Sequence, residues 1–450
     1  MSAAARVLLL AAPLVLLAAP ARAQDEPSLG GGLTFTGAPT LKELQAQQKA
    51  CEARKPPRKA KGTISESTYK RLERIIDAIG KGQFDESEVK LRELMEASRG
   101  DYEKAIILQT LGFVYGSNNK EMLAVKAFED ALATGSLPQQ VHEQMMFNIA
   151  QLYAADDKFD KSAQALNAYL QESCNPLPDA HILLATVSAE KKQWREALKQ
   201  VDLALVKGGV LKESWLQLKL ALHYELKEFP RCAEVLVALV AANPIKEDYW
   251  KQLSGMLFEI KKDPEALAVL ALAERKGWVD SEGEIRNLSN MYMYMQVPMK
   301  AAQLLERGID QKQMEATERN LESLGNAWLM AREYGKAEKA MARAAAASDK
   351  GELFKRLGQI QIENEQWKAA LDSLQKAQRK GGLKDPGETA FLVGVCAVQL
   401  KQYKTAEQAL RTAMQYEKTA QMAAQWLNHL QDEIAYNQAL GDGNGESKTN

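Results

Sequence analysis

Cysteine and histidine, from which metal and nucleophilic sites are often built, are scarce in this 450-residue chain, with four of each. The histidines, His142, His181, His223 and His429, are far apart and have no cysteine or carboxylate at ligand spacing. No HExxH, CxxC, P-loop or GxSxG motif is present. The sequence therefore predicts a protein that is not an enzyme and that holds no cofactor and no metal.

An excess of charge of one sign is also absent. The chain has 58 Lys and Arg against 59 Asp and Glu, a formal charge of -1. Because no global basic field is present, nucleic acid is not an expected partner. Beyond the N-terminus, Lys, Arg or Glu interrupts each apolar run within a few turns, so no membrane span is expected in the mature chain.

One apolar run, Val7–Ala19, stands near the start of the chain. Its 13 residues are fewer than the roughly 20 that span a bilayer as a helix. Arg6 precedes the run, and small residues including Ala23 follow it. This pattern predicts a signal peptide over residues 1–23, cleaved before Gln24, and hence an exported protein. An uncleaved anchor is the alternative interpretation.

The few cysteines leave few ways to form a disulfide, although export makes oxidation accessible. Cys232 and Cys396 fall inside helical apolar patterns and are expected in the core. Cys51 lies in a linker-like stretch and Cys174 beside a turn, CNPLP. A disulfide between these two is a hypothesis, because sequence alone does not show that their Cα atoms approach each other.

Proline is uncommon, with 14 in the chain, while Ala, Leu, Lys and Glu are abundant, which favours helix. Residues 24–62 differ. They contain a run of three glycines and the stretch KACEARKPPRKAKG, with six Lys or Arg against one Glu. This composition predicts a disordered basic linker, with contact to an anionic surface as the alternative interpretation. Residues 441–450 are likewise expected to form a disordered tail.

Residues 63–417 repeat about ten times. Each segment holds the end of one helix, a short polar turn and a second helix, as in GNAWLMAREYGKAEKAMARA and GQIQIENEQWKAALDSLQKA. A small residue recurs early in the second helix at intervals of 33 to 38 residues, with a large apolar residue four positions on. This spacing is typical of tetratricopeptide repeats, in which two antiparallel helices meet at the small residues. The small residues are Ser87, Ala124, Ser162, Ala197, Cys232, Ala266, Ala301, Ala337, Ala370 and Ala406.

A last helical segment, residues 418–440, has no partner helix. Trp426, Leu427 and Leu430 keep helical spacing in it, as expected of the cap that closes the end of a solenoid. We therefore predict an all-α fold: a tetratricopeptide repeat (TPR) solenoid, a right-handed superhelix of antiparallel helix pairs, with a C-terminal capping helix.

The stretch NMYMYMQVPMKAA, beginning at Asn290, concentrates methionine and tyrosine. Exported methionine clusters can bind Cu(I), but only Met291 and Met295 share a helix face. The flanking repeats instead place the stretch at the end of a first helix, with Tyr292 between the helices and Pro298 beginning the next helix. We interpret the cluster as core and groove lining.

The concave face of the expected solenoid is the candidate binding site. Cationic and amide side chains recur there on successive first helices and could clamp a peptide carboxylate while bonding to its extended backbone. The alternative is that these are ordinary solvated helix positions. The candidate groove residues are Lys251, Arg286, Asn290, Met293, Tyr294, Arg319, Asn326, Lys355 and Gln359.

Several stretches between about Tyr249 and Leu430 resemble an exported bacterial TPR family associated with TonB-ExbB-ExbD energy-transduction systems. They are YWKQLSGM, VPMKAAQLLERGI, NLESLGNAWLMAREYGKA, GGLKDPGETAFLVGV and AAQWLNHL. The resemblance implies a periplasmic scaffold that acts by contact with a protein or peptide partner, with TonB, ExbB or ExbD as candidates, in TonB-dependent uptake. An adaptor in envelope polysaccharide or outer-membrane protein assembly is the alternative.

Overall fold

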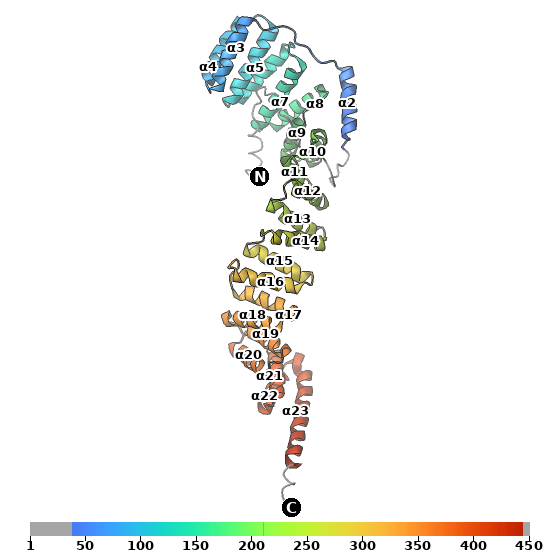
Figure 1. Cartoon of the computed structure of the whole chain (residues 1–450), viewed down its shortest axis with the longest axis vertical. Coiled ribbons are helices and arrows are strands. Elements are labelled where there is room, and N and C mark those ends of the chain that lie inside the picture. Colours follow the sequence, from blue (N-terminus) through green and yellow to red (C-terminus); the bar gives the residue numbers. More distant parts are fainter. Residues whose placement is uncertain (1–37, 210, 444–450) are drawn as a thin grey trace, which may run out of the picture. The chain divides into compact units, whose positions relative to one another are not determined.

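The computed structural model describes residues 38–209 and 211–443, which form 22 α-helices and no strand. The expected signal peptide, the linker before residue 38 and the tail from residue 444 lie outside the described residues. The chain divides into two units, Met1–Ile260 and Lys261–Asn450, and each is treated by itself. Within each unit, consecutive helices pack in pairs (Figure 1), and the predicted all-α repeat fold is confirmed.

The first unit contains helix α2 followed by five consecutive helix pairs, α3/α4 to α11/α12, and then α13. The helices are α2 (Leu41–Arg54), α3 (Glu66–Gly80), α4 (Phe84–Ala97), α5 (Asp101–Ser117), α6 (Glu121–Ala133), α7 (Gln139–Ala155), α8 (Phe159–Glu172), α9 (Pro178–Glu190), α10 (Trp194–Gly208), α11 (Glu213–Glu225), α12 (Phe229–Ala242) and α13 (Glu247–Glu259).

The second unit begins with α14 and continues with four helix pairs, α15/α16 to α21/α22, and the terminal helix α23. The helices are α14 (Asp263–Arg275), α15 (Glu282–Tyr294), α16 (Pro298–Asp310), α17 (Glu318–Met330), α18 (Tyr334–Ala347), α19 (Glu352–Glu363), α20 (Trp367–Lys380), α21 (Pro386–Gln399), α22 (Tyr403–Ala413) and α23 (Glu417–Gly443).

The recurring small residues lie where the sequence spacing places them. All ten are 0% exposed, from Ser87 to Ala406. The large apolar residues four positions later, such as Phe128 and Leu410, are also buried. Cys232 is one of the ten small residues, Cys396 is buried on the first helix α21, and both are free thiols. The repeat spacing thus decides which face of each second helix is buried.

Glycines in the first helices let the second helix come close. A Cβ added at Gly112 would lie 2.6 Å from Cδ1 of Phe128, and one at Gly394 would lie 2.7 Å from the Leu410 side chain. These distances are too short for real atoms, so the close approach requires glycine. Two further pairs repeat the contact, Gly325 with Met341 and Gly358 with Leu374.

The turn inside each helix pair contains a residue with a left-handed backbone. In one turn Asn119 has φ 53°, and the next N–H, that of Lys120, donates to the Tyr115 carbonyl at 2.9 Å. This Schellman arrangement satisfies carbonyls at the end of the first helix. Eight of the nine residues are not glycine: Gly82, Asn119, Asp157, Lys192, Lys227, Gln296, Arg332, Glu365 and Lys401.

The prediction that residues 24–62 are wholly disordered is wrong for residues 41–54, which form helix α2. The Thr40 hydroxyl accepts from the Glu43 N–H at 3.3 Å, and the Glu43 carboxylate accepts from the Thr40 N–H at 2.7 Å. This capping box begins the helix. No residue of α2 is buried, and a disulfide joins Cys51 in α2 to Cys174, with Cα atoms 5.4 Å apart.

Helix α23 covers the end of the last pair in the second unit. Leu427 and Leu430 are buried against α21 and α22, and Trp426 packs edge-on against Phe391 with ring centroids 6.2 Å apart. The helix runs to Gly443, so the first residues of the expected tail are helical. This is the packing expected of a capping helix.

Candidate functional site

The first helices of the second unit carry a shared face, here called the first-helix face. Spacings of i, i+4 and i+7 bring Arg286, Asn290 and Met293 to one side of α15. The equivalent residues are Glu322, Asn326 and Leu329 on α17, and Lys355, Gln359 and Ile362 on α19. Hydrogen bonds between neighbouring first helices show that these rows lie side by side.

On α15 the guanidinium of Arg286 is paired with a carboxylate of the same helix, that of Glu282. Glu282 also accepts from Asn320 Nδ2 of α17 at 3.1 Å and from the Glu315 N–H at 3.3 Å. The Asn320 hydrogen bond is the main cause that holds the pKa of Glu282 below its usual value. Nε of Arg286 is buried and has no hydrogen-bond partner within the described residues. The positive charge of Arg286 is thus largely compensated by the Glu282 carboxylate of the protein itself.

Helices α17 and α19 are joined by Arg356, which the sequence analysis did not select. Its Nη1 lies 2.8 Å from Glu322 Oε1 and donates to Asn326 Oδ1 at 3.3 Å. The amide oxygen of Asn326, a predicted partner-binding group, is therefore occupied. Its Nδ2 group remains as a donor.

Lys355 of α19 is the most enclosed cation of the face, with a side chain only 7% exposed. Its Nζ donates to Glu388 Oε2 of α21 at 2.8 Å and lies 3.3 Å from Glu352 Oε1. Burial lowers the pKa of Lys355, but hydrogen bonds and charge from Glu388 and Glu352 outweigh it and raise the pKa above the ordinary value. Gln359 Nε2 donates to the other oxygen of Glu388, Oε1, at 3.0 Å.

These contacts change the picture of the site. The expected clamp needs cations that are free to bind a partner's carboxylate, whereas Arg286 and Lys355 already have carboxylates of their own. A partner carboxylate would have to displace Glu282 or Glu388, and the gain would be small because one ion pair replaces another. Arg319 and Asn290 are exposed and remain available for polar contacts.

Beside the polar rows, the ends of the first helices expose apolar side chains. Tyr294 is 64% exposed and Met330 48% exposed. Met293 and Leu329, which precede them in the sequence, and Ile362 at the matching position of α19 are partly exposed. These five residues, at matching positions of α15, α17 and α19, form what we call the apolar column. Only Met293 and Tyr294 were selected from the sequence; equal repeat position is the signal that would have added the other three.

Lys251, the remaining predicted groove residue, belongs to the first unit. It lies on α13 with its Nζ 3.7 Å from Glu247 Oε1. It is therefore not part of the first-helix face defined here.

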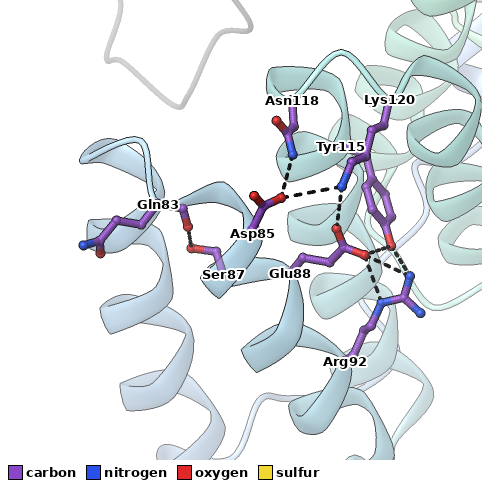
Figure 2. A network of polar contacts seen from close by, with 8 residues as sticks. All are labelled: Gln83, Asp85, Ser87, Glu88, Arg92, Tyr115, Asn118 and Lys120. Atoms are coloured by element: carbon purple, nitrogen blue, oxygen red, sulfur yellow. Dashed lines mark hydrogen bonds and ion pairs between the residues drawn. The ribbon is translucent and has the colours of Figure 1, made fainter.

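The first unit carries polar networks that join its helices (Figure 2). Glu88 of α4 accepts from Lys120 Nζ at 3.0 Å, from the Tyr115 hydroxyl at 3.1 Å and from Arg92 Nη2 at 3.0 Å. Burial raises the pKa of Glu88, but these hydrogen bonds outweigh it and leave the pKa lowered. Every charge in this network has an internal partner, which indicates a structural role.

Two open hollows lie at turns within helix pairs, one in each unit. One, of 400 Å³, is lined by residues 157–161 and Lys191 in the first unit. The other, of 720 Å³, is lined mainly by residues 365–369 and Leu400 in the second unit. Both have lysines and carboxylates in their lining. The described residues contain no group of three His, Cys, Asp or Glu side chains placed to hold a metal ion.

The buried small residues, the paired helices and the regular turns define a helical repeat protein of the TPR class. No protein-family model matches the chain. No curated protein matches it either.

Solved structures similar to the chain are TPR proteins and assemblies. One is a TPR protein from Parabacteroides merdae, with 15% identity and a TM-score of 0.37, covering 66% of this chain and 100% of that one. Another is YrrB, described as a TPR protein with an unusual peptide-binding site. It has 19% identity and a TM-score of 0.32, and the match covers 41% of this chain and 92% of YrrB. A third is the APC/C hetero-tetramer Cut9-Hcn1, with 13% identity and a TM-score of 0.28, covering 87% and 81%. The likeness goes no further than the fold.

Proposed function

We propose that this protein is a periplasmic scaffold of a TonB-dependent energy-transduction or uptake system, and that it holds a protein partner on the first-helix face of its second unit. The TPR fold suggests a protein-protein interaction scaffold. The observation that carries the proposed site is the apolar column, because large apolar side chains exposed side by side mark interaction surfaces.

The chemistry of the face favours a partner segment with apolar anchors. Tyr294 and Met330 supply contact area, and methionine adapts to different partner shapes. Asn290, Arg319 and Nδ2 of Asn326, which donates no hydrogen bond within the described residues, can bond to the partner's backbone. Because the other cations of the face are neutralised internally, a carboxylate is not the main recognition element.

The TonB assignment rests on the resemblance of the stretches between Tyr249 and Leu430 to the family named above. The periplasmic location rests on the same resemblance, together with the export signal expected from the N-terminal pattern Arg6 to Ala23. No helix of the described residues is long and apolar enough to cross a membrane. In the proposed function, the scaffold meets the periplasmic parts of TonB, ExbB or ExbD by contact.

A crosslinking pulldown from the envelope fraction of the native cell tests both parts of the proposal. We compare the wild type with Tyr294→Ser/Met330→Ser. The control is Tyr69→Ser/Met422→Ser, since Tyr69 is 57% and Met422 46% exposed and they belong to α3 and α23, not to the helices of the face. Loss of two exposed anchors should weaken binding by about 1–2 kcal/mol each with little change in the melting temperature.

Recovery of TonB, ExbB or ExbD by the wild type and the control, but not by the face variant, would support the pathway and the site together. Equal recovery by all three proteins would keep the pathway and refute the site. Recovery of polysaccharide-export or outer-membrane assembly components instead would refute the TonB assignment in favour of the adaptor function.

A further inference from the structure

A second surface, unrelated to the first-helix face, lies in the first unit. Residues 55–61, KPPRKAK, follow α2 and are exposed along their whole length. We call this segment the basic strap. At its start, the disulfide between Cys51 and Cys174 holds it to the loop between α8 and α9. Lys55 Nζ donates to the Gln171 carbonyl at 2.8 Å, which reinforces this attachment.

The rest of the strap is held by its backbone and one ion pair. Arg58 Nη2 lies 2.9 Å from Glu172 Oε1, and the Arg58 carbonyl accepts from the Gln139 N–H at 3.0 Å. The Lys61 N–H donates to the Ser136 carbonyl at 2.9 Å. The strap is therefore fixed to two loops between helix pairs, and its conformation is ordered before any partner arrives.

The ammonium groups of two lysines of the strap take no part in the contacts that hold it in place. Lys59 and Lys61 are exposed and have no carboxylate partner within the described residues. Lys49 and Arg54 of α2, close in sequence, also pair with no carboxylate there, since Arg54 Nε donates only to the Ala50 carbonyl. Lys59 forms no backbone hydrogen bond to the described part of the chain, so its main-chain groups are open as well.

We propose that the basic strap is a docking surface for an acidic, extended segment of a partner protein. Carboxylates of such a segment would bind Lys59 and Lys61 through charge-assisted hydrogen bonds, and its backbone could pair with the open main-chain groups of the strap. Because the strap is held in place, little conformational entropy is lost on binding.

An acidic protein segment fits this surface better than an anionic membrane does. Among the described residues, no large apolar side chain between residues 42 and 68 is strongly exposed, the nearest being Leu41 and Tyr69. The strap therefore lacks the apolar anchors that accompany basic residues in interfacial membrane binding. Its exposed main-chain groups are useful to a peptide but not to lipid headgroups.

The probe is a fluorescein-labelled ten-residue glutamate peptide, with a glutamine peptide of equal length as its control. Binding to the full chain is followed by fluorescence anisotropy at low salt and at physiological salt. Lys59→Glu/Lys61→Glu should weaken binding about tenfold, since two attractions become repulsions. The matched control Lys126→Glu/Lys199→Glu makes the same change in net charge at exposed positions of α6 and α10 and should change binding less than about twofold.

A third variant tests whether the fixed geometry matters. Cys51→Ser/Cys174→Ser keeps every charge but releases one end of the strap, and we expect binding to weaken severalfold. Equal losses in the strap and control charge variants would overturn the proposal, because net charge would then explain binding. Unchanged binding by the serine variant, or binding to phosphatidylglycerol vesicles but not to the glutamate peptide, would also overturn it.

Discussion

Two glycines in first helices of the first unit allow a direct test of how the repeats pack. Gly112 of α5 is buried against Phe128, with a hypothetical Cβ only 2.6 Å from Cδ1 of the ring. Gly255 of α13 is exposed, and a Cβ there would meet nothing within 4 Å. Both are interior helix positions. Changing each to alanine therefore gives the same gain in helix propensity with different packing.

The two substitutions should have opposite signs. Replacing glycine by alanine inside a helix stabilises it by about 0.5–1 kcal/mol. At Gly255 nothing opposes this gain, so Gly255→Ala should raise the free energy of unfolding by that amount. At Gly112 the added methyl group overpacks a fully buried ring, which costs about 1–3 kcal/mol. After the propensity gain is subtracted, Gly112→Ala should destabilise the protein by roughly 0–2.5 kcal/mol, with about 1 kcal/mol as the mid-range value.

Urea unfolding followed by far-ultraviolet circular dichroism gives the two midpoints, and amide hydrogen exchange shows where protection changes. We expect a lower midpoint for Gly112→Ala, with faster exchange in α5 and α6, and a higher midpoint for Gly255→Ala. If Gly112→Ala matched Gly255→Ala, the close approach of α5 and α6 would not be real and the packing argument would fail.

Three further predictions concern charges and the disulfide. Lys219 Nζ lies 2.7 Å from Asp202 Oδ1, and the two side chains are 2% and 4% exposed, respectively. Lys219→Met should lower the free energy of unfolding, measured by thermal unfolding, by about 3–5 kcal/mol, because it leaves the Asp202 carboxylate buried without its cation. The double change Lys219→Met/Asp202→Leu should restore most of this loss, and a failure to do so would contradict the pairing. Hydrogen bonds from Thr68, then from Ser65 and Ser98, lower the pKa of Glu103 from 4.5 to about 2. The ionised Glu103 carboxylate should therefore contribute fully to the free energy of unfolding above pH 4.5, and this contribution should be lost as the pH falls toward 2. Glu103→Gln should remove about 1 kcal/mol of stability at pH 7 and flatten the acid side of the urea profile, and an unchanged profile would refute this. Reducing the disulfide should abolish amide protection in α2, which has no buried residue, but not in α5; protection retained in α2 would show that the helix is stable without it.

Much of the fold follows from the spacing of a few residue types. Small residues such as Ala124 and Ala337 locate the close contacts, because a larger side chain would hold the two helices apart. The capping box at Thr40 and Glu43 is also visible in the sequence and would have predicted α2, but the basic, proline-containing stretch after it led to an expectation of disorder. The left-handed turn residues were not foreseen, because lysine or glutamate occupies positions where glycine is the usual signal.

The candidate site was less predictable. Repeat position placed Arg286, Asn326, Lys355 and Gln359 on a common face, and the structure does bring most of them together in adjacent rows. Repeat position did not indicate that the Glu388 carboxylate would accept hydrogen bonds from both Lys355 and Gln359. Partners on different repeats are about 30 residues apart, and no local pattern records which carboxylate reaches which cation.

The sequence by itself determined the helices, their pairing and the buried faces, because these depend on local spacing and on the need to bury apolar side chains. The tertiary structure decided which charges remain available. It paired Arg286 with a carboxylate of its own helix, and Lys355 and Arg356 with carboxylates of neighbouring repeats, and it left the apolar column beside them. It also fixed the basic strap in place while leaving Lys59 and Lys61 unpaired. Electrostatic pairing depends on distances in space, so only the folded chain shows which surfaces can bind a partner.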